Sequence, residues 1–123
     1  MTPALVKGLA LGRIGVGVAM LLQPEAAVRG WIGTRAASNG GSHVLARAFG
    51  ARDLSLGAGT LAALASGRDA RDWVAAGAFA DVADLVATTR GEDIPVSGKL
   101  LVAALASSAI AVSAAYLARG DRS

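Results

Sequence analysis

The chain has 123 residues, of which 54% are hydrophobic and only 17% charged, whereas a soluble domain carries about 25% charged residues. This length fits one domain over residues 1–123, and the composition favours a membrane protein. The basic residues behind the net charge of +3 are scattered, which argues against a nucleic-acid partner. The absence of cysteine excludes disulfide and thiol chemistry.

The first apolar segment, residues 4–22, predicts a transmembrane helix with one charge, Arg13, at its centre. It ends at a Gln-Pro pair, which is a natural helix stop. A cleaved signal peptide is the rejected alternative, because Arg13 would interrupt its apolar region and no clean cleavage site follows.

A longer connection, residues 23–43, follows the first segment. Trp31 lies there between Arg29 and Arg35, which predicts either a short segment at the membrane interface or an ordinary polar loop. Residues 38–42 are rich in Gly and Ser and predict a flexible stretch.

The second segment, residues 44–66, has a charge-free part that is too short for a crossing of about 20 residues. This helix must therefore extend back through Arg52 and Asp53. The third segment, residues 72–89, contains Asp81 and Asp84.

The fourth segment, residues 100–118, contains no charge and by itself meets the spanning criterion. The short turns at residues 67–71 and 90–95 predict antiparallel neighbours. The sequence thus predicts an all-α, four-helix transmembrane bundle with short turns and an interfacial loop after the first helix. We expect a multi-pass protein of the plasma membrane, whose partner is the lipid bilayer.

Four crossings place both termini on one side of the membrane. Basic residues on the side of the termini slightly outnumber those on the other side, which favours cytoplasmic termini. The two groups are Lys7, Arg68, Arg71, Arg119 and Arg122 against Arg29, Arg35, Arg90 and Lys99.

Charges inside these helices need partners, because one charge at mid-membrane costs roughly 2.5–3.5 kcal/mol on the insertion scale. Positions along the predicted helices place opposite charges at matching depths. We predict that Arg52 meets Asp84, and that Arg13 meets Asp81 or Asp53. The predicted network balances three positive against three negative charges: Arg13, Arg47, Arg52, Asp53, Asp81 and Asp84.

This network has two open interpretations. Buried ion pairs can fix helix register and packing, or they can mark an ion, proton or substrate path. The D-x-x-D spacing of Asp81 and Asp84 also occurs in Mg²⁺ sites, but only Asp53 offers a further acidic ligand. We therefore predict no catalytic, cofactor-binding or metal-binding residue.

Small residues predict close helix packing in lipid, either within the bundle or between protomers. Gly8 and Gly12 form a G-x-x-x-G pair in the first helix, and Gly50 and Gly57 offer a similar surface in the second.

Residues 46–57 read ARAFGARDLSLG and contain a G-A-R-[DE]-x-x-x-G motif. The motif resembles one in small bacterial membrane proteins of uncharacterised activity, where an Arg in the first helix and a D-x-x-D in the third accompany it. The resemblance implies a four-helix membrane fold and no known activity. Its matching positions are Arg13, Arg52, Asp53, Asp81 and Asp84.

Three functions remain open at this point. The first is a non-catalytic membrane subunit or scaffold that forms a homo-oligomer or binds a partner membrane protein. The second is a small proton-coupled transporter or carrier that uses the intramembrane carboxylates. The third is a lipid-acting enzyme that uses the D-x-x-D motif.

Overall fold

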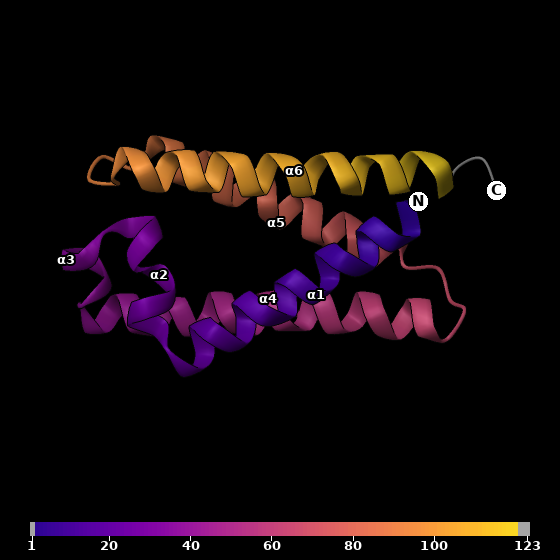
Figure 1. Cartoon of the computed structure of the whole chain (residues 1–123), viewed down its shortest axis with the longest axis horizontal. Coiled ribbons are helices and arrows are strands. Elements are labelled where there is room, and N and C mark those ends of the chain that lie inside the picture. Colours follow the sequence, from indigo (N-terminus) through magenta and orange to yellow (C-terminus); the bar gives the residue numbers. More distant parts are fainter. Residues whose placement is uncertain (1, 121–123) are drawn as a thin grey trace.

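The computed structural model describes residues 2–120, which form six α-helices and no strand (Figure 1). The predicted all-α class is confirmed, and the four long helices lie where the four apolar segments were expected. The helices are α1 (Thr2–Leu22), α2 (Pro24–Ile32), α3 (Thr34–Ala37), α4 (Gly40–Ala65), α5 (Arg71–Arg90) and α6 (Val96–Gly120).

The connection after α1 is more ordered than the sequence predicted, because most of it is helical. Pro24 lies in the first turn of α2, where its missing N–H costs no hydrogen bond. Gly33 separates α2 from α3 with a φ of 92°, a conformation that favours glycine. The side chain of Asn39 accepts a hydrogen bond from Gly41 N, so the stretch predicted to be flexible is instead the capped start of α4.

The four long helices form two tight pairs. α1 packs along α4, α5 packs along α6, and looser contacts between α1 and α6 and between α4 and α5 join the pairs. Between Thr2–Leu22 and Arg71–Arg90, no Cα atoms approach within 8 Å. α1 and α5 therefore lie diagonally across the bundle.

Glycines allow α1 and α4 to approach closely. A Cβ atom on Gly57 would lie 2.5 Å from the carbonyl oxygen of Ala10, and one on Gly17 would lie 2.6 Å from the carbonyl oxygen of Gly50. Both distances are far below van der Waals contact, so the helix backbones touch at these positions. Gly50 and Gly57 are two of the packing positions singled out from the sequence.

The G-x-x-x-G pair of α1 lies on a different face of that helix. A Cβ atom on Gly8 or Gly12 would meet nothing within 4 Å. Within the described bundle this pair therefore makes no close helix contact, and packing between protomers, the other alternative from the sequence, stays a prediction. Both glycines border the opening between α1 and α6 instead of the α4 contact.

α2 closes one end of the bundle through Trp31. Its indole Nε1 donates a 3.0 Å hydrogen bond to Thr88 Oγ1 on α5, and its ring lies 5.5 Å from that of Phe49 on α4. The backbone of Trp31 also lies directly against Gly98 on α6, where no Cβ atom would fit. One residue of α2 thus contacts three long helices.

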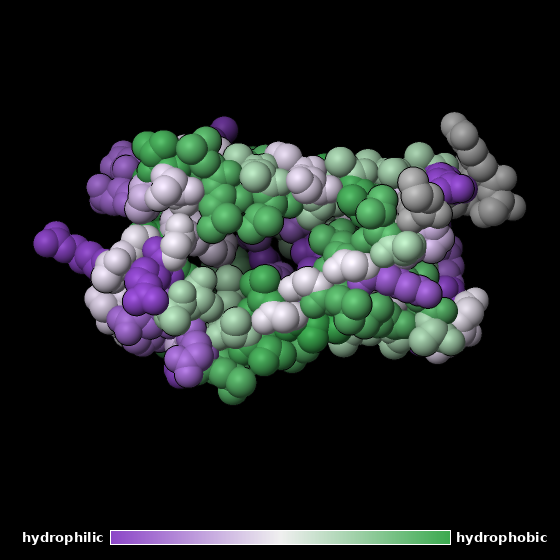
Figure 2. Space-filling view, viewed as in Figure 1, coloured by the Kyte–Doolittle hydropathy of each residue, from purple (hydrophilic) through white to green (hydrophobic). Residues whose placement is uncertain are grey.

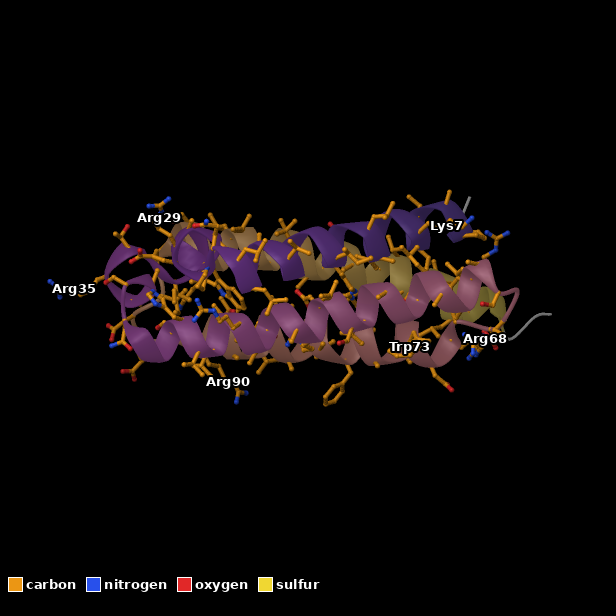
Figure 3. The ribbon with its side chains drawn as sticks, turned by 90° about the horizontal axis from the view of Figure 1, so that it is seen from below. Lys7, Arg29, Arg35, Arg68, Trp73 and Arg90 are labelled. Carbon is orange, nitrogen blue, oxygen red and sulfur yellow. The ribbon has the colours of Figure 1, made fainter. Side chains whose placement is uncertain are left out.

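Large apolar side chains face outward along the middle of the bundle, and hydrophilic groups gather toward its two ends (Figure 2). Phe79 on α5 is 77% exposed and Leu105 on α6 is 62% exposed. Lys7 and Arg68 lie at one end, with Arg29, Arg35 and Arg90 at the other (Figure 3). These five residues fall at the two ends as they were grouped from the sequence, while Arg122 lies outside the described residues and the orientation in a membrane stays a prediction.

By length and composition, two helices of the described chain could cross a membrane: α1 over residues 3–22 and α6 over residues 96–119. α4 and α5 are long enough, with 26 and 20 residues. By composition, neither of them is a candidate span.

Candidate functional site: a charged cavity inside the bundle

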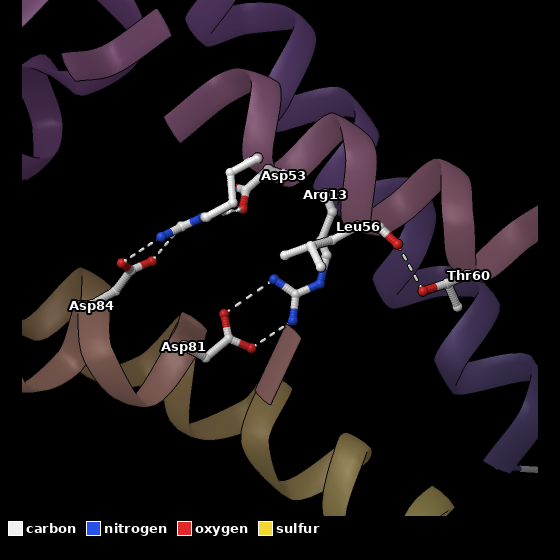
Figure 4. A network of polar contacts seen from close by, with 7 residues as sticks. Arg13, Asp53, Leu56, Thr60, Asp81 and Asp84 are labelled. Carbon is white, nitrogen blue, oxygen red and sulfur yellow. Dashed lines mark hydrogen bonds and ion pairs between the residues drawn. The ribbon is translucent and has the colours of Figure 1, made fainter. Parts of the chain in front are cut away.

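The most buried ion pair in the described part of the chain joins Arg13 on α1 to Asp81 on α5. The guanidinium Nη1 donates to Asp81 Oδ1 at 3.1 Å and Nη2 donates to Oδ2 at 2.6 Å (Figure 4). Both side chains are only 10% exposed. Because α1 and α5 are diagonal partners, this bidentate pair crosses the middle of the bundle, and the predicted buried salt bridge is present.

Gly77 provides the space for that guanidinium. A Cβ atom on Gly77 would lie 2.8 Å from Nη2 of Arg13. Gly77 precedes Asp81 by four residues, so both positions lie on one face of α5, one turn apart. Sequence reasoning missed Gly77, although the G-x-x-x-D spacing would have indicated a helix face on which a flat cation can rest.

A second ion pair joins α4 to α5 and is shared. Arg52 donates to both oxygens of Asp84, at 2.9 and 2.7 Å. The same guanidinium makes longer contacts of 3.3 and 3.4 Å to Oδ1 of Asp53. Its Cζ lies 4.7 Å from the centre of the Phe49 ring, which is a cation–π contact. Arg52 therefore serves two carboxylates, and Asp84 holds it more closely than Asp53 does.

Arg47 does not belong to this cluster, which corrects the predicted network. Its side chain is exposed, and its Nε donates to the carbonyl oxygen of Leu21 at 3.5 Å, near the end of α1. Five residues of helix place Arg47 about 7.5 Å farther along α4 than Arg52. The cluster thus contains two guanidiniums, Arg13 and Arg52, and the three carboxylates Asp53, Asp81 and Asp84.

A cavity of about 430 Å³ lies beside the cluster and opens between α1 and α6. Figure 2 shows the opening, with hydrophilic side chains at its base and apolar residues around it. Within residues 2–120, the five clustered residues are the only charged groups that line it. The remaining lining residues are Gly8, Leu9, Gly12, Val16, Met20, Ala27, Trp31, Leu101, Val102, Leu105, Ala106 and Ala109.

A much smaller cavity of about 10 Å³ also borders Arg13. This is the space that one water molecule occupies. Thr60 and Ser113 line it, and the hydroxyl of Thr60 donates to the carbonyl oxygen of Leu56 at 2.7 Å. The buried Oγ of Ser113 has no hydrogen-bond partner within the described chain, so a water molecule there would satisfy it.

The D-x-x-D carboxylates are held apart by different arginines. Asp81 pairs with Arg13 and Asp84 with Arg52, so both oxygens of each carboxylate already accept hydrogen bonds. In the described part of the chain, no group of three or more His, Cys, Asp or Glu side chains could hold a metal ion. The geometry is that of two ion pairs with one additional carboxylate.

Fold and site together define an all-α protein with a buried Arg13–Asp81 salt bridge and two helices able to cross a membrane. A comparison with protein-family models, with curated proteins and with solved structures finds no match. Function is therefore inferred from the geometry and charge of the cavity.

Proposed function

We propose that this is an integral membrane protein in which α1, α4, α5 and α6 all cross the bilayer. The length of α5, 20 residues, corresponds to about 30 Å and equals the usual hydrocarbon thickness. Arg52 of α4 and Asp84 of α5 pair with each other inside the bundle and do not face the surrounding lipid. The exposed Phe79 and the apolar side chains around the bundle would contact lipid.

Pairing across helices supports this proposal energetically. A lone Arg or Asp at mid-membrane would oppose insertion by roughly 2.5–3.5 kcal/mol. Arg13 and Asp81 come from different helix pairs, so neither α1 nor α5 satisfies its own charge. The two helix pairs therefore hold together in lipid because each neutralises charges of the other.

We further propose that the protein is a small proton-coupled carrier, which is the second of the three functions considered from the sequence. The observation that supports it is the unequal charge of the cavity, where three carboxylates face two guanidiniums. In a water-poor bundle the remaining negative charge must be neutralised by a proton or by a bound cation. A site that alternates between the two couples proton movement to ligand binding.

Asp53 is the carboxylate that carries this role. Asp81 and Asp84 each hold a guanidinium through two hydrogen bonds, whereas Asp53 has only the two longer contacts to Arg52. The charged groups that act on it are Arg52 on its own helix, Arg13 on α1 and Asp84 on α5. From α6, the cavity receives apolar side chains alone.

Infrared spectroscopy of the protein in lipid nanodiscs tests the proton site. The wild-type protein should show the carbonyl stretch of a protonated carboxyl group shielded from water. This band should disappear in Asp53→Asn and persist in the control Asp72→Asn, which removes an exposed carboxylate in the first turn of α5. A spectrum that Asp53→Asn leaves unchanged would contradict the proposed role.

A non-catalytic membrane subunit is the second candidate function. It is favoured by the open face of α1, where a Cβ atom on Gly8, Gly12 or Gly15 would have nothing within 4 Å, because such a face admits a helix of another protein. Native mass spectrometry in mild detergent separates the candidates. A carrier needs no partner, whereas a subunit should retain a second chain, and Gly12→Leu should release it.

A further inference from the structure

We infer that the cavity binds a lipophilic organic monocation, with its positive charge at Asp53 and its apolar body against α6. This inference rests on the proposed carrier function and names the substrate class of the same site. It follows from three features of the cavity, namely its charge, the chemistry of its walls and its route of entry.

The charge of the cavity selects for a single positive charge. With Arg13 paired to Asp81 and Arg52 paired to Asp84, only the charge of Asp53 remains to be balanced. A monocation completes that balance, whereas a dication would leave one positive charge and an anion would leave two negative charges in a water-poor site. Neutral ligands would leave the carboxylate unpaired.

The walls of the cavity select for an apolar body. Every α6 residue that lines it is aliphatic, including Leu101, Leu105 and Ala109, and α1 adds Val16 and Met20. The volume of about 430 Å³ falls within the range of roughly 300–1,000 Å³ that is typical of small-molecule sites. A hydrated inorganic cation would leave most of this apolar surface against water.

An aromatic residue lines the same cavity. Trp31 lines the cavity together with Asp53, and its ring is held in place by Thr88 and Phe49. Tryptophan is the aromatic side chain with the strongest attraction for cations. A cation between the indole and the carboxylate would contact both.

The opening between α1 and α6 gives the route of entry. Gly8 and Gly12 form its α1 border and carry no side chains that could close it. If α1 and α6 both cross the bilayer, this opening faces lipid and not water. The ligand would then enter from the membrane, which requires a molecule that partitions into lipid.

Binding and proton release are linked by charge balance. When the cation pairs with the carboxylate of Asp53, the proton that previously neutralised it leaves to water. One proton should therefore be released for each cation bound, and acid should compete with the cation.

The test uses two ions of the same size and shape but opposite charge, tetraphenylphosphonium and tetraphenylborate. Each is titrated calorimetrically into nanodiscs that contain the protein, and empty nanodiscs correct for partitioning into lipid. Wild-type protein should bind the phosphonium ion and not the borate ion. Asp53→Asn should weaken phosphonium binding by about tenfold or more, and Asp72→Asn should leave it unchanged.

A second variant tests whether binding needs the free volume of the cavity, independently of its charge. In Gly12→Leu a side chain extends into the cavity from a position where a Cβ atom meets nothing within 4 Å. This variant should retain the protonated-carboxyl band of Asp53 and lose phosphonium binding. Equal binding of both ions, full binding by Asp53→Asn, or no binding above empty nanodiscs would overturn the inference.

Flotation of the protein with liposomes distinguishes a failure of this inference from a failure of the proposed function. Protein that floats with liposomes and shows the Asp53 band, yet binds no phosphonium ion, overturns the substrate class alone. Protein that remains with the aqueous fraction after reconstitution overturns the membrane assignment and the inference together.

Discussion

The two ion pairs of the bundle use the same chemical groups and differ in their surroundings. Arg13 and Asp81 are each 10% exposed and hold each other through two hydrogen bonds. Arg52 is 29% exposed and divides its guanidinium between Asp84 and Asp53. The first pair is balanced and enclosed, while the second group has one carboxylate too many and lies near the aromatic residues of the closed end.

This difference separates a structural contact from a functional one. Removing either member of a buried ion pair destabilises the protein, because the other charge is then left unpaired. An unbalanced group can gain or lose a cation without breaking its existing pairs. We therefore propose that Arg13–Asp81 stabilises the fold and that Asp53 binds the ligand and the proton.

Breaking the Arg13–Asp81 pair should have the largest effect on the free energy of unfolding. Arg13→Ala leaves Asp81 unpaired in the middle of the bundle, and we expect a loss of about 3–5 kcal/mol in the free energy of unfolding. The double variant Arg13→Ala/Asp81→Ala should lose much less than the sum of the two single variants. Reversible unfolding in mixed detergent measures all three, and additive losses would show that the pair does not interact.

Replacing glycine by alanine at two positions, one against Arg13 and one facing open space, tests the next largest expected effect. Gly77→Ala places a methyl group 2.8 Å from Nη2 of Arg13, so the guanidinium must shift or the helices must separate. We expect a loss of about 1–3 kcal/mol. Gly12→Ala faces open space and should be neutral or slightly stabilising. Equal thermal stability of the two variants in detergent would mean that Gly77 does not position Arg13.

Removing the shared arginine should have a smaller effect than removing the enclosed one. Arg52 is 29% exposed, whereas Arg13 is 10% exposed, so its interactions are less completely buried. We expect Arg52→Ala to cost about 1–2 kcal/mol, and Asp84→Ala to add nothing further in the double variant. The same unfolding assay tests this, and a double-variant loss equal to the sum would refute the pairing.

Neutralising the additional carboxylate should have the smallest effect on stability. Asp53→Asn removes a negative charge but leaves Arg13–Asp81 and Arg52–Asp84 in place. Its free energy of unfolding should match that of wild type within about 0.5 kcal/mol, although binding is lost. A loss as large as that of Arg13→Ala would assign Asp53 to the structure and not to function.

The sequence predicted the helices and the partners of the arginines better than it predicted the site. Helix depth alone indicated that Arg52 meets Asp84, because the rise per residue is fixed. Arg47 entered the network wrongly, because it lies about 7.5 Å farther along the helix than Arg52 and its exposed side chain contacts Leu21 instead. Without Arg47 the cluster has two positive and three negative charges. This inequality can be recognised only in the tertiary structure.

The remaining features arise from contacts between distant residues. Gly77 matters only because Arg13 lies on it, and the helices of residues 24–37 depend on Trp31 packing against three other helices. The cavity results from loose contact between α1 and α6. Apart from the four-residue spacing of Gly77 and Asp81, none of these features leaves a pattern in the sequence.

The most direct test of the account asks whether α5 crosses the bilayer despite its charges. The chain has no cysteine, so Phe79→Cys introduces a single site for a nitroxide label at an outward-facing position in the middle of α5. In proteoliposomes the label should collide readily with oxygen and hardly at all with a water-soluble nickel chelate, whereas a label at Arg68 should show the reverse. Equal access of the chelate to both positions would contradict the transmembrane assignment and the role of the buried charges.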